Sequence, residues 1–173
     1  MAIPRSCLVL LWLIASFFTS AAFGDNFQLT ASGGGVDLSA ILTATPTGTP
    51  DQFLVTGITG TYNGSTLDGL IPGGPSPTIT PSGQWEFDNL LYTGGGPIVD
   101  YWGLGFYLSG GVEANLFNNP PYTFGYGTSA NGTFTELYPT DVSLTAVPEP
   151  SSLMLLGGAA LGLLGPIRRK LLG

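Results

Sequence analysis

Apolar and polar residues alternate with a period of two along several short stretches in the middle of this chain. In the clearest stretch every second position is apolar, giving one face made of Trp102, Leu104, Phe106 and Leu108. The opposite face of that stretch carries Tyr101, Gly103, Gly105 and Tyr107. A period of two is that of a β-strand with one buried face, and no long window shows the helical period. The pattern therefore predicts an all-β domain.

The same alternation and the turn residues between the stretches predict where the strands lie. Strands are expected at residues 27–29, 38–43, 52–62, 65–70, 84–88, 101–108, 122–127 and 141–146. Asn63-Gly64 has the sequence of a two-residue hairpin turn. Loops rich in Gly and Pro are expected at 33–35, 46–50, 72–83, 94–97 and 118–121. About eight or nine short strands favour a small antiparallel β-sandwich or a jelly-roll-like domain.

A high content of glycine and proline leaves intrinsic disorder as an alternative. The chain has 27 Gly and 14 Pro among 173 residues, close to the level typical of low-complexity sequence. Residues 25–147 nevertheless contain two Trp, seven Tyr and seven Phe, and a chain that cannot collapse carries fewer aromatic residues. We therefore expect a folded domain with loose loops.

The first 24 residues have the parts of a secretory signal peptide. Arg5 supplies the positive start, residues 8–18 form an apolar run, and small residues follow. Ala22 and Gly24 fit the rule for cleavage by signal peptidase, so the mature chain is expected to start at Asp25. An uncleaved anchor is the alternative. The only cysteine lies in this segment, so we expect no disulfide in the mature chain.

Three features follow one another at the C-terminal end. They are the triplet Pro148, Glu149 and Pro150, an uncharged stretch at 151–167, and the basic cluster Arg168, Arg169 and Lys170. The prolines end any preceding strand and hold the glutamate in an extended segment. The stretch, as a helix, is about 25 Å long, slightly shorter than a hydrocarbon core of about 30 Å. The basic cluster is then a cytoplasmic stop by the positive-inside rule.

This tail resembles the PEP-CTERM family of protein-sorting signals, from Val147 to Gly173. The resemblance rests on the triplet, on a Gly- and Leu-rich span that includes residues 153–158, and on the Arg-rich end. Pro166 departs from the residues that the family more often has there. The resemblance implies recognition by an exosortase, cleavage near the triplet and transfer to the cell exterior. It also implies a bacterium in which such sorting accompanies exopolysaccharide and biofilm formation.

These segments predict a chain of three parts. Residues 1–24 are the signal peptide, residues 25–146 the β-rich extracytoplasmic domain, and residues 147–173 the sorting and anchor segment, with a transmembrane helix at 151–167. The domain is expected outside the cytoplasm, tethered to the membrane before processing and at the cell surface or in the extracellular matrix afterwards.

Similar tails are also catalogued as the C-terminal domain of ice-binding proteins. A membrane span with a charged end cannot bind ice, so any such activity would belong to the domain before it. Threonine recurs at every second position from Thr43 to Thr49, but Pro46 and Pro50 interrupt this single row. We therefore consider ice binding unsupported and expect an exposed Thr/Pro-rich linker that is open to O-glycosylation.

The charge distribution excludes several functions. Ten of the 11 acidic residues lie between Asp25 and Val147, and none of the four basic residues does. The domain cannot neutralise phosphate groups, so we expect no nucleic-acid binding. It also has no His, Lys, Arg or Cys to act as base, nucleophile or anion clamp, so we expect no enzyme activity.

Carboxylates leave two further possibilities. A pair of acids can cleave glycosides, and the available acids are Glu86, Asp88, Asp100, Glu113 and Glu136. Acids that alternate with apolar residues are more simply the solvated face of a strand. Calcium is the one metal that these residues suit, provided that Asp88-Asn89 and Glu113-Ala114-Asn115 converge. No motif spacing supports such a site, and no other cofactor is expected.

Aromatic residues offer a surface for sugar rings. Trp85 and Trp102 share their strand faces with Phe and Leu, which favours a place in the core. Tyr101 and Tyr107 lie on the opposite face and are the better candidates for exposed stacking residues.

The sequence thus predicts an exported bacterial glycoprotein that is a structural or adhesive component of the extracellular polysaccharide matrix. A carbohydrate-binding module, with or without calcium, is the alternative. The expected partners are an exosortase, signal peptidase, cell-surface polysaccharide and the membrane.

Overall fold

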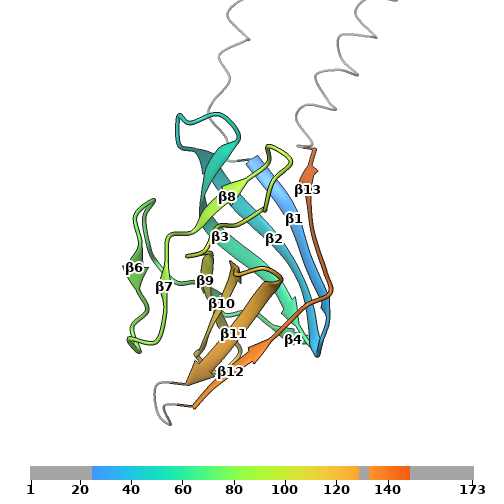
Figure 1. The fold of residues 1–173 in the computed structure, drawn as a ribbon, viewed down its shortest axis with the longest axis vertical. Coiled ribbons are helices and arrows are strands. Elements are labelled where there is room, and N and C mark those ends of the chain that lie inside the picture. Colours follow the sequence, from blue (N-terminus) through green and yellow to red (C-terminus); the bar gives the residue numbers. More distant parts are fainter. Residues whose placement is uncertain (1–24, 129–132, 149–173) are drawn as a thin grey trace, which may run out of the picture.

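The fold consists of antiparallel β-sheets, as the alternation predicts. The computed structural model describes residues 25–128 and 133–148, and these two ranges contain 13 strands and no helix (Figure 1). Two large sheets face each other, and a small two-stranded sheet lies to one side (Figure 1).

The first sheet contains the N-terminal strands and the last strand of the domain. Its strands are β1 (Asp25–Gly33), β2 (Val36–Pro46), β3 (Gln52–Tyr62), β4 (Ser65–Thr66), β8 (Leu90–Tyr92) and β13 (Asp141–Val147). Their spatial order is β13-β1-β2-β3-β4, and β8 pairs with the start of β3. The predicted turn at Asn63-Gly64 connects β3 to β4, and both residues have the positive φ, 46° and 77°, that such turns require.

The second sheet is a meander with one added edge strand. Its strands are β5 (Gly69–Leu70), β9 (Leu104–Leu108), β10 (Val112–Asn118), β11 (Tyr122–Thr128) and β12 (Thr133–Leu137). Their order is β12-β11-β10-β9-β5, so sequential strands are neighbours from β9 to β12. This sequential order is that of two facing meanders, and it differs from the Greek-key order of a jelly roll.

The hydrophobic core lies between the two large sheets. Its fully buried side chains include Leu29, Leu38, Leu42, Val55, Leu91, Val99, Leu104, Phe106, Leu116 and Phe124. The rings of Tyr62 on β3 and Phe124 on β11 stack with centroids 4.8 Å apart and so join the two sheets. Each buried side chain of this size contributes roughly 1.5–3 kcal/mol to folding.

The segment that connects β5 to β8 crosses the outer face of the second sheet. We call this segment, residues 72–88, the arm. It contains β6 (Thr78–Ile79) and β7 (Glu86–Phe87), which pair with each other. The Phe87 ring lies so close to Gly105 of β9 that no side chain fits there. The carboxylate of Glu113 accepts hydrogen bonds from the Ser82 amide, at 3.0 Å, and from the Ser82 hydroxyl. The arm is therefore fixed to β9 and β10.

The prediction of one continuous strand at 65–70 is wrong, because this stretch forms two short strands, one in each large sheet. The amide of Leu67 still donates to the Gly60 carbonyl in the first sheet, whereas the amide of Asp68 donates to the Tyr107 carbonyl in the second. The chain crosses at this point with Leu67 buried in the core. Both sheets thereby gain an edge strand from one short segment.

Two other predictions about local structure need correction. Of the predicted strand 84–88, only Glu86 and Phe87 are paired as a strand. The threonine row was predicted to be a linker, but Thr43 and Thr45 are exposed residues of β2, which continues to Pro46. Proline at the last position of a strand costs little, since pairing ends there.

Candidate functional site

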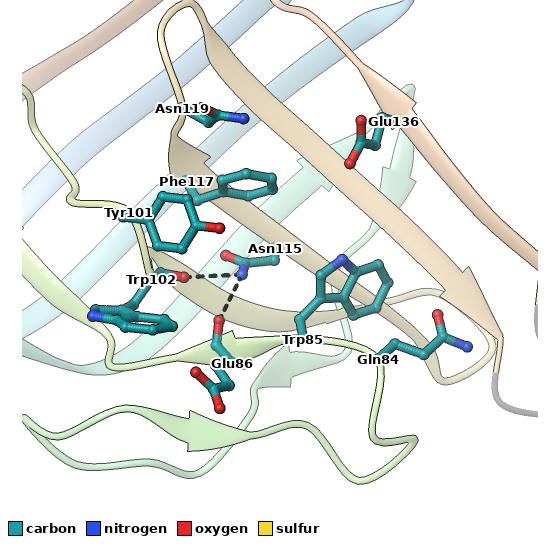
Figure 2. Close-up of a pocket in the computed structure, with 9 residues that line it drawn as sticks. All are labelled: Gln84, Trp85, Glu86, Tyr101, Trp102, Asn115, Phe117, Asn119 and Glu136. Carbon is teal, nitrogen blue, oxygen red and sulfur yellow. Dashed lines mark hydrogen bonds between the residues drawn. The ribbon is translucent and has the colours of Figure 1, made fainter.

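A hollow of about 370 Å³ lies between the arm and the outer face of the second sheet, and we call it the first hollow (Figure 2). Its lining residues are Gln84, Trp85 and Glu86 of the arm, Tyr101 and Trp102 of the loop before β9, Asn115 and Phe117 of β10, Asn119, and Glu136 of β12. These residues come from four separate stretches of sequence, so the hollow exists only in the folded chain.

Three aromatic rings meet at one side of the first hollow. Tyr101 is 61% exposed, and its ring contacts the edges of Trp102 and Phe117 at centroid distances of 5.2 and 6.4 Å. The Asp100 carboxylate fixes this loop, because its Oδ1 accepts hydrogen bonds from the amides of Trp102 (2.9 Å) and Gly103 (3.1 Å). The backbone of the loop that carries Tyr101 and Trp102 is therefore held in place.

Asn115 supplies a buried hydrogen-bond acceptor at the floor of the first hollow. The residue is only 2% exposed, and its Nδ2 donates to the carbonyls of Trp102, at 2.9 Å, and Glu86, at 3.2 Å (Figure 2). Its Oδ1 accepts no hydrogen bond from any described residue. A buried acceptor without a donor costs about 1–3 kcal/mol.

Two carboxylates give the first hollow a negative rim. Glu86 and Glu136 are both exposed, and Figure 2 shows Trp85 and Asn115 between them. The Tyr138 hydroxyl donates to Glu136 Oε2 at 3.0 Å. No Lys, Arg or His occurs anywhere between Asp25 and Val147. The hollow therefore suits neutral or positively charged groups and repels anions.

A second hollow, of about 430 Å³, also has Tyr101 in its wall. Its other lining residues are Pro50, Asp51, Tyr92, Gly94, Gly96, Pro97, Val99, Asp100 and Asn118. The Tyr92 hydroxyl donates to Asp100 Oδ2 at 3.3 Å. Burial is the main cause that raises the pKa of Tyr92, so this hydroxyl stays protonated at neutral pH.

Asp88 is a buried carboxyl group beside Asp100. It is 2% exposed, and its Oδ1 accepts a hydrogen bond from the Leu90 amide at 3.0 Å. Burial raises the pKa of Asp88 to about 7; the Leu90 hydrogen bond opposes this, and the charge of Asp100 adds to it. A substantial fraction of Asp88 therefore carries a proton near neutral pH.

The side chains that the sequence suggested for calcium have other partners in the structure. Asn89 uses its amide group to bind the Ile71 carbonyl and the Gly105 amide, while the Glu113 carboxylate binds Ser82. Asp88 lies against Asp100 instead of Glu113. Within residues 25–128 and 133–148, no three potential metal-ligating acids, His or Cys gather.

The aromatic candidates are placed differently from one another. Tyr101 is exposed and lines both hollows, whereas Tyr107 is half-buried and lines neither. The expectation of a core position is wrong for Trp102, which is half-buried in the wall of the first hollow. Trp85 is buried as expected, at 8% exposure, but it belongs to the arm and lies outside the central core.

Sequence reasoning gave no role to Phe117 or Asn119 and offered Asn115 only for calcium. A signal was present, because Asn115 and Phe117 alternate with Ala114 and Leu116, which face the core. That alternation places the amide and the ring on the outer face of β10.

The terminal predictions lie mostly outside the described residues. This holds for the cleavage residues Ala22 and Gly24, for Glu149 and Pro150, and for the basic cluster at 168–170. Asp25 is the first described residue and opens β1. In the part of the chain that the structure describes, no helix has the length and apolar character to cross a membrane.

Comparison with known families gives one match. A family model of the PEP-CTERM protein-sorting motif matches residues 146–169, a range that begins in β13 and contains the Pro-Glu-Pro triplet. This confirms the resemblance seen in the sequence. No curated protein matches the chain significantly. No solved structure matches it significantly either.

Proposed function

We propose that this chain, which its PEP-CTERM motif identifies as an exported protein sorted by an exosortase, binds neutral polysaccharide of the extracellular layer in the first hollow. In this proposal the protein is an adhesive component of the matrix that surrounds the cell. The observation that carries the proposal is a set of three aromatic rings that pack edge to face in a hollow also lined by amide and carboxylate side chains.

The mixture of groups in the first hollow matches the surface of a sugar. A pyranose ring has an apolar face of C–H groups and an equator of hydroxyls. The rings of Tyr101, Trp102 and Phe117 offer apolar contact, and the side chains of Glu86, Asn119 and Glu136 offer hydrogen-bonding groups for hydroxyls. Five of the nine lining residues are Gln, Glu or Asn, so the wall of the first hollow is mainly polar.

The charges favour a neutral sugar over an acidic one. The carboxylates of Glu86 and Glu136 line the hollow, and residues 25–147 contain no cation to pair with a uronate, sulfate or phosphate. An acidic polymer would bring like charges together without compensation, which costs free energy.

We propose binding without turnover. A glycosidase needs two carboxylates that face one bond, one of which acts as a general acid. Both Glu86 and Glu136 are exposed, and the Trp85 and Asn115 side chains lie between them (Figure 2). This arrangement supports a holding site.

The binding proposal is tested with surface polysaccharide isolated from the native host and freed of acidic fractions. Tyr101→Ala should weaken its retention by the full-length protein at least about tenfold, which corresponds to about 1.4 kcal/mol. Tyr107→Ala, which removes a tyrosine outside both hollows, should retain binding. Thermal denaturation of both variants checks that they are folded. Equal binding by Tyr101→Ala and the parent would refute the proposal.

The proposed sorting is tested by the intact mass of the protein from host membranes and culture medium. We expect a chain that starts at Asp25 and ends near the Pro148–Pro150 triplet, with added hexose mass if it is glycosylated. Glu149→Ala should block the C-terminal cleavage. A mass that reaches Gly173 with and without the substitution would make the tail a plain anchor.

A further inference from the structure

We propose that the second hollow continues the first, so that the ligand is an internal stretch of a neutral polysaccharide that occupies both hollows at once. This inference rests on the proposed function of the first hollow and adds the length of the ligand to it. The site would then select polymers over free monosaccharides.

The two hollows are adjacent because Tyr101 is a wall of both. On two segments, neighbouring residues line different hollows. Asp100 lines the second hollow and Trp102 the first, with Tyr101 between them. Asn118 lines the second hollow, whereas Phe117 and Asn119 on either side of it line the first. A ligand that leaves one hollow past the exposed Tyr101 ring therefore enters the other. Tyr101 is 61% exposed, so part of its side chain is open to a passing chain.

The second hollow combines apolar and hydrogen-bonding groups, as the first does, but its wall is more apolar. Pro50, Pro97 and Val99 give it apolar wall, and the Asp100 and Asn118 side chains give it hydrogen-bonding groups. It too has carboxylates and no cation, since Asp51 and Asp100 line it. The same class of ligand, uncharged and rich in hydroxyls, therefore suits both hollows.

Hydrogen bonds fix the two hollows relative to each other. The Asn118 amide donates to the Asp100 carbonyl at 2.7 Å, which joins the Tyr101 loop to the end of β10. The Ile98 amide donates to the Tyr122 hydroxyl at 2.8 Å, and the Tyr92 amide to the Ile98 carbonyl at 2.9 Å. A ligand that spans a preformed pair of sites loses less free energy to ordering the protein.

The volumes agree with a ligand longer than one sugar. The hollows measure about 370 and 430 Å³, each near the lower end of the roughly 300–1,000 Å³ found for small-molecule sites. A single sugar leaves one of the two empty. A chain that fills both adds the contacts of the second hollow without a second loss of translational freedom.

The test uses neutral oligosaccharides obtained by partial hydrolysis of the host's surface polysaccharide and separated by length, from one to about eight units. Their affinity for the full-length protein is measured by calorimetry. We expect the affinity to rise at least tenfold between the shortest fragments and those that reach the second hollow, and then to level off.

A pair of variants assigns that rise to the second hollow. Gly96 lines this hollow, and a Cβ added there meets no atom within 4 Å, so Gly96→Trp adds a large side chain at the hollow without a clash at its Cβ. Gly74→Trp is the matched control, because Gly74 is equally open and lines neither hollow. Gly96→Trp should reduce the affinity of long fragments to that of short ones and leave short ones unchanged. Gly74→Trp should change neither.

The outcomes separate this inference from the proposed function. Short and long fragments that bind equally, or a Gly96→Trp variant that retains the full rise, would overturn the two-hollow site and leave the first hollow as a sugar site. Absence of binding by every fragment and by the intact polymer would overturn both.

Discussion

At the scale of single residues, Asp88 is distinctive because its carboxyl group is buried. It is 2% exposed and lies beside Asp100, and burial raises its pKa to about 7. An Asp in the unfolded chain has a pKa of about 3.9. Between these two pH values the folded state binds the proton and the unfolded state releases it.

The sign of the resulting pH dependence follows from this difference. Because the folded state holds the Asp88 proton more tightly, the contribution of Asp88 to the free energy of unfolding is greatest below about pH 4. This contribution declines as the pH rises to about 7. Asp88→Asn keeps an uncharged side chain that can accept the Leu90 amide, so it should remove this decline and raise the melting temperature at pH 8 by roughly 5 °C. Thermal denaturation from pH 4 to pH 8 measures both effects.

Asp37→Asn is the control for that experiment. Asp37 is an exposed acid on β2, so its removal should leave the slope of melting temperature against pH unchanged. If Asp88→Asn keeps the parent's slope of melting temperature against pH, a group other than Asp88 causes the pH dependence, and the prediction is wrong.

At the scale of elements, a buried carboxylate is one of the groups that hold the arm. Glu113 of β10 is 5% exposed and binds the Ser82 amide and hydroxyl, which fixes the end of the arm that carries Gln84, Trp85 and Glu86. Glu113→Ala leaves the Ser82 groups without this acceptor. We expect hydrogen exchange at residues 72–86 to become at least tenfold faster, while β1 to β3 keep their protection.

Glu113→Gln separates the hydrogen bond from the shape of the side chain. It retains one acceptor for the Ser82 amide and should change exchange in the arm much less than Glu113→Ala does. Because the arm is one wall of the first hollow, Glu113→Ala should also weaken polysaccharide binding. Uniformly faster exchange across both sheets would contradict a local role.

Local patterns were sufficient for the elements that pair with their neighbours in sequence. The bounds predicted for the strand at 52–62 and the turn at Asn63-Gly64 are confirmed, since both follow from alternation and turn chemistry. The crossing at Leu67–Asp68 could not be predicted, because the Asp68 amide pairs with Tyr107, far along the chain. Sequence alone does not indicate which sheet edge a short strand will join.

The site was predictable only in part for a similar reason. The exposure of Tyr101 follows from the alternation, but Trp102 leaves the face of Leu104 because Gly103 has a φ of 72° and the strand begins after it. The meeting of the arm, the Tyr101 loop and β10 depends on bonds such as those of Asn115, between residues 13 and 29 positions apart. Such contacts leave no periodic trace in the sequence.

At the scale of the whole molecule, the absence of cations determines which polymers can bind. Between Asp25 and Val147 there are ten acids and no base, so the domain repels acidic polysaccharides at low ionic strength. We expect a uronate-rich polymer to show no retention at low salt. The neutral polymer should bind equally at low salt and at about 0.1 M, where the Debye length is about 10 Å.

The double substitution Glu86→Gln with Glu136→Gln tests whether the rim of the first hollow contributes to this selectivity. It should increase retention of the uronate-rich polymer severalfold and leave the neutral polymer unchanged. The exposed acid Asp37, replaced by Asn, serves as a remote control with no effect. Stronger binding of the acidic polymer by the parent protein would contradict the charge argument.

The most direct test of the account is a fluorescence titration of the mature protein with the neutral surface polysaccharide. Trp85 and Trp102 are the two tryptophans of residues 25–147, and both line the first hollow. We predict a saturable change in tryptophan emission and protection from acrylamide quenching, both lost in Tyr101→Ala. Emission and quenching that stay unchanged at saturating polysaccharide would contradict the claim that the first hollow is a sugar-binding site.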